Sequence, residues 1–268
     1  MAEYFALTAD PLPQNLFGED SGYSIRRLSP EERIAIEDYY FSLGERLTIN
    51  PATTAVVVSD EHLSKTTLGE FATLAEFALG ISTIAGFSAI TVIAALTSNK
   101  CSNAVQRPAP NSNAPQFPTK LKKNAASKWL RLVFVAKGKS RDGLHVTTDR
   151  YVRFCKAGYT PDGLLDLCIC LESLIESETE IAFRFANCLA KITGDADAEN
   201  ISGMLSDLYS FRSKVVHGLD FGKAHKKLAP HFSELRLTAR TILTKYILHL
   251  TEHSKDDWKR LLKSSLFT

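Results

Sequence analysis

The chain of 268 residues has few cysteines, and its five form no Cys-x2-Cys pair of the kind that binds zinc. Cys168 and Cys170 lie two residues apart, a spacing that points them to different sides of a helix. The other three are Cys101, Cys155 and Cys188. This usage excludes a disulfide framework and predicts core thiols in a reducing compartment, so we expect a cytoplasmic protein.

Signature motifs of several enzyme classes are also missing. The sequence has no Gly-x4-Gly-Lys-Ser/Thr loop for phosphates and no Gly-x-Ser-x-Gly elbow of a serine hydrolase. His249 and His253 are four residues apart, but no third ligand completes a metal site with them. The residues thus indicate none of these site types, and we find no internal repeat.

Membrane signals are weak. The first residues, MAEYFALTADP, lack a basic region followed by an apolar core, so we expect no secretory signal. Residues 77–97 carry no charge and could barely span a bilayer, but glycines, serines and threonines lower their hydrophobicity. We favour a helix, a turn near Gly86, and a strand or helix around residues 90–96. No stable membrane insertion is expected, and a membrane-associated effector is the weakest alternative.

Charge is plentiful but unevenly distributed. Residues 117–160 carry 11 basic and 2 acidic side chains, and residues 212–263 carry 12 basic and 5 acidic ones. Residues 160–200, between them, carry 9 acidic and 2 basic side chains. The two basic segments are compatible with an anionic polymer as ligand. For each segment taken alone, a solvated helix face is the simpler explanation.

The first 106 residues predict a small α/β or α+β domain. Ser29 followed by Pro30 is a good helix start, and the helix would run to about Leu43 with Ile34, Ile36 and Tyr40 on its buried face. Residues 54–58, TAVVV, read as a short buried strand. Four prolines in residues 107–118 then predict a linker and a domain boundary.

Residues 119–268 predict a helical domain. A basic helix at residues 128–137, a charged turn at 137–143 and a helix from Thr147 or Thr148 come first. Thr160-Pro161-Asp162 starts another helix, and a further one ends at Gly194. Then come a helix capped by Asp195 or Asp197, a long helix over residues 228–250 and a short one around Trp258. The fold class is therefore mainly α, with a C-terminal antiparallel helical bundle.

Residues 201–218 contain the most informative pattern. Apolar residues at helical spacing form one stripe, on which Arg212 also falls: Ile201, Met204, Leu205, Leu208 and Val215. Tyr209, Ser213 and His217 follow each other at intervals of four, and Gly218 is typical of a helix end. The pattern gathers a permanent cation, a phenol, a hydroxyl and an imidazole near one helix terminus.

The spacing Arg-Ser-x-x-x-His resembles the Arg-x4-6-His signature of the HEPN superfamily. The segment LYSFRSKVVHG, preceded by DLCICLESLIE and EIAFRFANCLAKITG, is similar to the ApeA-like HEPN group over roughly residues 145–250. The resemblance implies a metal-independent endoribonuclease, as a toxin or antiviral-defence effector. It also implies a homodimer with one composite site at the two-fold axis, RNA as substrate and no cofactor.

The chemistry of the residues fits that activity. RNA carries its own nucleophile, the 2′-hydroxyl, so proton transfer by His217 and phosphate stabilisation by Arg212 would suffice. Ser213 or Tyr209 would orient one of them. Glu172 is a candidate counterion of Arg212, and Lys214 is a further supporting cation.

A non-catalytic interpretation stays open. Many active members place Asn, Asp or His after the arginine, whereas this chain has Ser213, which cannot act as an ionised acid. Arg212 would then only pair with Glu172 inside the helical domain, and His217 would only cap its helix. The protein would be a HEPN-like dimerisation or partner-binding module, and a regulatory protein partner is compatible with both interpretations.

Overall fold

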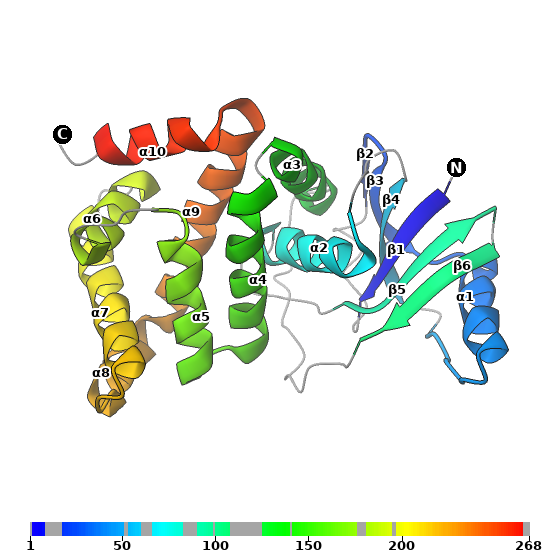
Figure 1. Cartoon of the computed structure of the whole chain (residues 1–268), viewed down its shortest axis with the longest axis horizontal. Coiled ribbons are helices and arrows are strands. Elements are labelled where there is room, and N and C mark those ends of the chain that lie inside the picture. The colour runs from blue at the N-terminus through cyan, green and yellow to red at the C-terminus, as the bar shows by residue number, and fades with distance from the viewer. Residues whose placement is uncertain are drawn as a thin grey trace. The chain divides into compact units, whose positions relative to one another are not determined.

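The computed structural model describes residues 2–8, 18–50, 53–59, 66–82, 90–98, 100–107, 125–139, 141–175, 181–194 and 197–264. It is mainly helical, with a small antiparallel sheet near the N-terminus (Figure 1). The chain divides into two compact units, residues 1–134 and 135–268. The division falls inside helix α3 (Ala125–Lys139), whereas we expected a boundary at residues 107–118. Apart from Arg107, that expected linker lies outside the described residues.

Within the described ranges, six strands of the first unit form one sheet in the order β2-β3-β4-β1-β5-β6. The strands are β1 (Ala2–Thr8), β2 (Gly18–Asp20), β3 (Tyr23–Arg27), β4 (Thr54–Ser59), β5 (Ile90–Thr97) and β6 (Lys100–Gln106). All neighbours pair antiparallel. The sequence left α/β and α+β open for the first domain, and the antiparallel pairing of these strands identifies it as α+β.

Helices cover both faces of this sheet. On one face, Phe5, Val57 and Ala94 pack against Ile36 and Tyr40 of α1 (Pro30–Ser42). On the other face, aromatic rings connect the sheet with α2 (Leu68–Ser82) and α3, through the pairs Tyr4–Phe71, Tyr23–Phe134 and Phe71–Phe134. Because both faces are covered, the central strand β4 is apolar at consecutive positions, as the sequence predicted for residues 54–58.

The predicted start of α1 is confirmed. Ser29 caps the helix, its side chain accepts the Glu32 N–H, and the Glu32 carboxylate accepts the Ser29 N–H in return. Glu32 is 7% exposed and also receives two hydrogen bonds from Arg26, of 2.7 and 2.6 Å. The predicted buried face is partly wrong, since Ile34 is half exposed while Ile36 and Tyr40 are buried.

The uncharged run at residues 77–97 is divided between two elements, α2 and β5, as favoured above. The expected turn at Gly86 lies outside the described residues. Glu76, one residue before the run, is fully buried and accepts the Ile90 N–H at 2.9 Å, while Arg107 lies 3.4 Å from its other oxygen. No helix in the described part of the chain combines the length and the apolar character needed to cross a bilayer.

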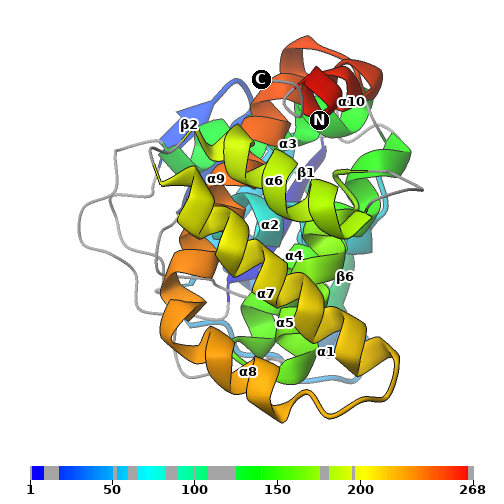
Figure 2. The same cartoon turned by 90° about the vertical axis from the view of Figure 1, so that its left-hand side faces the viewer.

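The described part of the second unit is entirely helical and contains no strand. Its helices are α4 (Arg141–Ala157), α5 (Pro161–Glu172), α6 (Ile181–Thr193), α7 (Ala198–Val216), α8 (Gly222–Leu228), the 3₁₀ turn η3 (Ala229–His231), α9 (Phe232–Glu252) and α10 (Lys255–Ser264). In Figure 2 this unit is turned toward the viewer, and α7 lies between α6 and α8. Apolar residues from α5, α6, α7 and α9 fill its core.

Several predicted helix ends are confirmed by their caps. The Thr160 hydroxyl accepts the Gly163 N–H at the start of α5, and Gly194 ends α6 with a φ of +66°. Asp197 holds the cap position of α7 without a side-chain cap hydrogen bond, and Asp195 lies outside the described residues. The cysteines of α5 and α6 are buried thiols, and burial raises the pKa of Cys168 and Cys170.

Three element boundaries differ from the prediction. The charged turn at residues 137–143 is wrong, because α3 continues to Lys139 and α4 begins at Arg141. For the same reason α4 does not start at Thr147 or Thr148. The long helix expected from Leu228 is broken. Helix α8 ends at Leu228, and η3 follows with Pro230, which has no backbone N–H to donate to a preceding carbonyl.

Candidate functional site

The buried stripe of α7 ends one residue before the arginine of the Arg–His pattern. Ile201, Met204, Leu205 and Leu208 are buried as expected, and Phe211 is the next buried residue at 0% exposure. Arg212 therefore lies at the edge of the stripe, with a side chain 27% exposed. The predicted place of Arg212 on the buried stripe is wrong, because the three-residue step from Leu208 leads to Phe211 on the core face and the four-residue step leads to its edge.

The C-terminus of α7 is closed by a Schellman motif. Gly218 adopts a φ of +65°, its N–H donates to the Val215 carbonyl at 3.2 Å, and the Leu219 N–H donates to the Lys214 carbonyl at 2.9 Å. His217 occupies the C-cap position, and its N–H donates to the Ser213 carbonyl at 3.1 Å. The backbone around His217 is thus fixed by three hydrogen bonds and a residue that favours positive φ.

Arg212 is engaged with two side chains. Its Nη2 lies 3.3 Å from Oε2 of Glu172, the last residue of α5, and its guanidinium lies over the Tyr209 ring at 5.8 Å. Burial and the Glu172 charge raise the pKa of Tyr209. The Tyr209 ring in turn packs against Phe185 of α6. The Nε of Arg212 is buried and has no hydrogen-bond partner in the described structure, so the guanidinium keeps unused donor capacity.

His217 lies apart from this cluster. Its side chain is exposed, and within the described ranges its imidazole makes no hydrogen bond or ion pair. His217 follows Arg212 by five residue steps, which in an α-helix correspond to a rotation of about 500°, or about 140° net, and a rise of about 7.5 Å. The structure therefore joins Tyr209, Arg212 and Glu172, and it directs His217 elsewhere. Ser213 and Lys214 are half-buried in the turn between them.

Two exposed apolar residues on either side of His217 were missed by the sequence analysis. Val216 is 55% exposed and Leu219 is 59% exposed. The sequence contained a signal for them, because Val216 and Leu219 flank the His-Gly dipeptide that ends the helix. They cannot both face the core when Leu208 and Phe211 already do. The two side chains give the end of α7 an exposed apolar character on both sides of His217.

Concave surfaces occur elsewhere. A pocket of about 440 Å³ lies along the first turns of α7 and is rich in carboxylates, among them Asp197, Glu199 and Asp207. In the described part of the chain, no three His, Cys, Asp or Glu side chains are grouped as ligands for a metal ion. His249 and His253 do lie together, with ring centroids 4.8 Å apart, at the end of α9. They are on a different helix from His217.

No protein-family model, curated protein or solved structure matches this chain.

Proposed function

We propose that this protein is a metal-independent endoribonuclease of the HEPN type, built on an antiparallel helical bundle and acting in the cytoplasm. The observation that carries the proposal is the imidazole of His217, which is exposed and has no partner among the described residues, at the closed end of α7 about one and a half turns after Arg212. A toxin or antiviral-defence effector is the biological role that the resemblance implies.

The proposed reaction uses only groups that the chain and RNA supply. His217 removes the proton of the 2′-hydroxyl or protonates the leaving 5′-oxygen, since a neutral imidazole accepts and an imidazolium donates. Arg212 donates hydrogen bonds to the phosphate oxygens as negative charge develops on them. Ser213 or Tyr209 orients one of these two groups. Lys214, in the same turn, adds positive charge near the phosphate.

The geometry of α7 supports a homodimer as part of this proposal. Because Arg212 and His217 of one chain point about 140° apart, one chain alone presents them poorly to a single phosphate. A second copy related by a two-fold axis would bring its own pair to the same cleft, and the two pairs would complete one site. Val216 and Leu219, exposed on both sides of His217, supply the apolar contacts such an interface requires.

A second candidate is favoured by a specific observation, the ion pair between Arg212 and Glu172. If this pair is permanent, Arg212 holds α5 and α7 together and does not bind phosphate. The protein would then be a non-catalytic HEPN-like module that dimerises or binds a partner protein through Val216 and Leu219.

RNA cleavage in the presence of EDTA separates the two candidates. We expect the purified protein to cleave RNA, and we expect His217→Ala and Arg212→Ala each to lower the rate about a hundredfold or more. His253→Ala and Arg153→Ala, which remove exposed side chains of the same types elsewhere in the unit, are the matched controls. Equal rates in the wild type and all four variants would reject the ribonuclease. Light scattering measures the dimer separately.

A further inference from the structure

We propose that the outward face of α8 is a phosphate-binding surface that holds single-stranded RNA beside His217. This inference rests on the proposed function and extends it from the reacting groups to substrate binding. The surface is defined by Lys223, Lys226 and Lys227, and it is called the α8 lysine face below.

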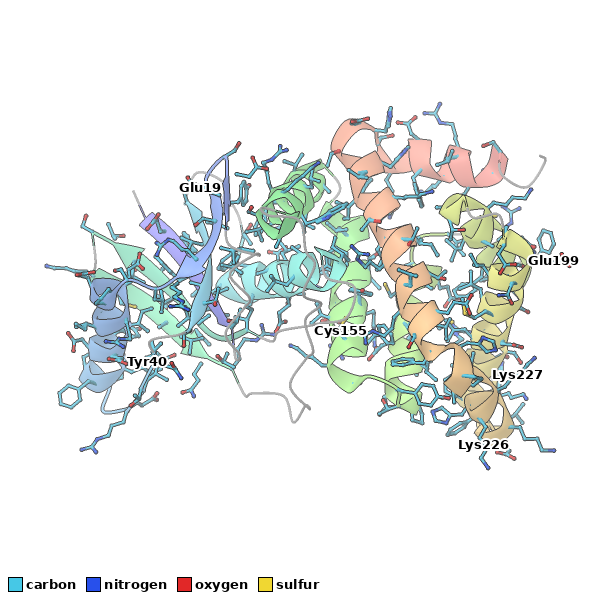
Figure 3. All side chains as sticks on the ribbon, turned by 180° about the vertical axis from the view of Figure 1, so that it is seen from behind. Glu19, Tyr40, Cys155, Glu199, Lys226 and Lys227 are labelled. Atoms are coloured by element: carbon cyan, nitrogen blue, oxygen red, sulfur yellow. The ribbon has the colours of Figure 1, made fainter. Side chains whose placement is uncertain are left out.

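The amphipathic pattern of α8 separates these lysines from the core. Phe221, His225 and Leu228 recur at intervals of four and three, and they are the half-buried or buried positions. Lys223, Lys226 and Lys227 recur at intervals of three and one on the opposite side, and all three are exposed. Figure 3 labels Lys226 and Lys227 on the outer side of α8. The three lysines therefore lie on one exposed side of α8, and of their ammonium groups that of Lys227 pairs with Asp207 of α7.

Aromatic contacts hold α8 firmly against the end of α7. Phe211 of α7 packs on Phe221 and His225, with ring centroids 5.7 and 5.9 Å apart. Tyr159 stacks on the His225 ring at 4.6 Å, and its hydroxyl donates to the His225 carbonyl. A flexible loop could not keep three lysines in a fixed relation to His217, whereas this packed helix can.

The ion pair of Lys227 fixes the direction of α8. Its Nζ lies 2.8 Å from the Asp207 carboxylate, which is ten residues before His217 on α7. Since Lys227 lies beside Asp207, α8 runs back along α7, and Lys223 lies nearer to the closed end that carries His217. The α8 lysine face thus extends from the proposed reaction site along the side of α7.

The local charge balance selects an anionic partner. From Lys214 to Lys227 the sequence has four lysines and two histidines, and Asp220 is its only acidic residue. The Asp220 side chain accepts the Gly222 N–H. In the described structure, Lys223 and Lys226 have no ion pair, so their charge is not neutralised within the chain. Exposed lysines in a row bind a phosphate backbone without reading its sequence.

RNA is favoured over an acidic protein because the lysine face leads directly to the imidazole proposed to cleave RNA. The competing occupant is a second copy of this chain, whose carboxylates at Asp197, Glu199 and Asp207 have complementary charge. The two occupants make different predictions for binding and for molecular mass, so one set of variants distinguishes them.

The experiment measures fluorescence anisotropy of a labelled, unstructured RNA with the full chain carrying His217→Ala, which prevents turnover. Into this background we introduce Lys223→Gln with Lys226→Gln, or, as matched control, Lys191→Gln with Lys263→Gln, which are exposed lysines of α6 and α10. We expect the first pair to raise Kd roughly tenfold near physiological salt and to reduce the slope of log K against log salt by about 1.4. We expect the control pair to change Kd less than about twofold.

Equal Kd values and salt slopes for the two pairs would overturn the inference. A loss of dimer mass in light scattering, with unchanged RNA affinity, would also overturn it and would assign the α8 lysine face to the contact between copies. The proposed function fails separately: a wild type that does not cleave RNA, but whose RNA binding depends on Lys223 and Lys226, would leave a phosphate-binding surface without a ribonuclease.

Discussion

Arg212 of α7 and Glu172 at the end of α5 form an ion pair in which Nη2 and Oε2 are 3.3 Å apart. Both side chains are about a quarter exposed, so solvent screens the pair and its contribution to stability is small. The same contact has two functional meanings. Either the pair is replaced when a phosphate binds Arg212 in place of the carboxylate, or the pair is permanent and Arg212 has a structural role.

The variant Glu172→Gln tests which meaning holds. If Arg212 serves a phosphate, loss of the competing carboxylate leaves cleavage intact or raises it, while Arg212→Ala abolishes cleavage. The free energy of unfolding should change by no more than about 1 kcal/mol in either variant, and urea titration measures it. A fall in cleavage that is equally large in Glu172→Gln and Arg212→Ala would mean that the intact pair is needed.

Gly218→Ala and Gly203→Ala should have opposite effects although both lie at the same helix. Gly218 has a φ of +65°, and a Cβ there would meet no atom within 4 Å, so the cost is backbone strain of about 1 kcal/mol. Gly203 lies within α7 and also has open space, so alanine should stabilise by about 0.5–1 kcal/mol. Thermal unfolding compares the two. Stabilisation by Gly218→Ala would contradict the Schellman ending of α7.

Glu76→Ala should strongly destabilise the first unit. It removes the acceptor of the Ile90 N–H and the partner of Arg107, and it leaves both polar groups near a fully buried position. We expect a loss of roughly 2–4 kcal/mol in the free energy of unfolding. The control Asp38→Ala, at an exposed position of α1, should change it by less than about 0.5 kcal/mol. Similar losses in both would contradict this role of Glu76.

Glu32 should make stability depend on pH. Burial alone would raise its pKa, but hydrogen bonds from Arg26 and the Ser29 N–H outweigh burial and hold the pKa of Glu32 below its ordinary 4.5. A carboxyl with a lowered folded pKa stabilises the fold above its unfolded pKa, and the stabilisation disappears as pH falls through the folded pKa. Unfolding at pH from about 6 down to about 3 should therefore show a loss that Glu32→Gln reduces. Glu45→Gln, at an exposed position, is the control, and equal pH profiles of the two variants would contradict this role of Glu32.

Local chemistry in the sequence was enough for elements with strong signals at their ends. Ser29, Pro30 and Glu32 specify the start of α1 because a capping box satisfies backbone N–H groups within four residues. Gly218 ends α7 for a similarly local reason, its tolerance of positive φ. β6, in contrast, has no apolar alternation, and the backbone hydrogen bonds it exchanges with β5 make it a strand.

The sequence by itself determined that an arginine, a hydroxyl and a histidine occur within two turns of a helix that ends at a glycine. Only the tertiary structure decided where they face. Helical periodicity allows either Phe211 or Arg212 to follow Leu208 into the core, and packing of α7 between its neighbours selects Phe211 because burying an aromatic ring is favourable and burying a guanidinium is costly. That choice leaves Arg212 beside Glu172 and His217 exposed at the end of the helix.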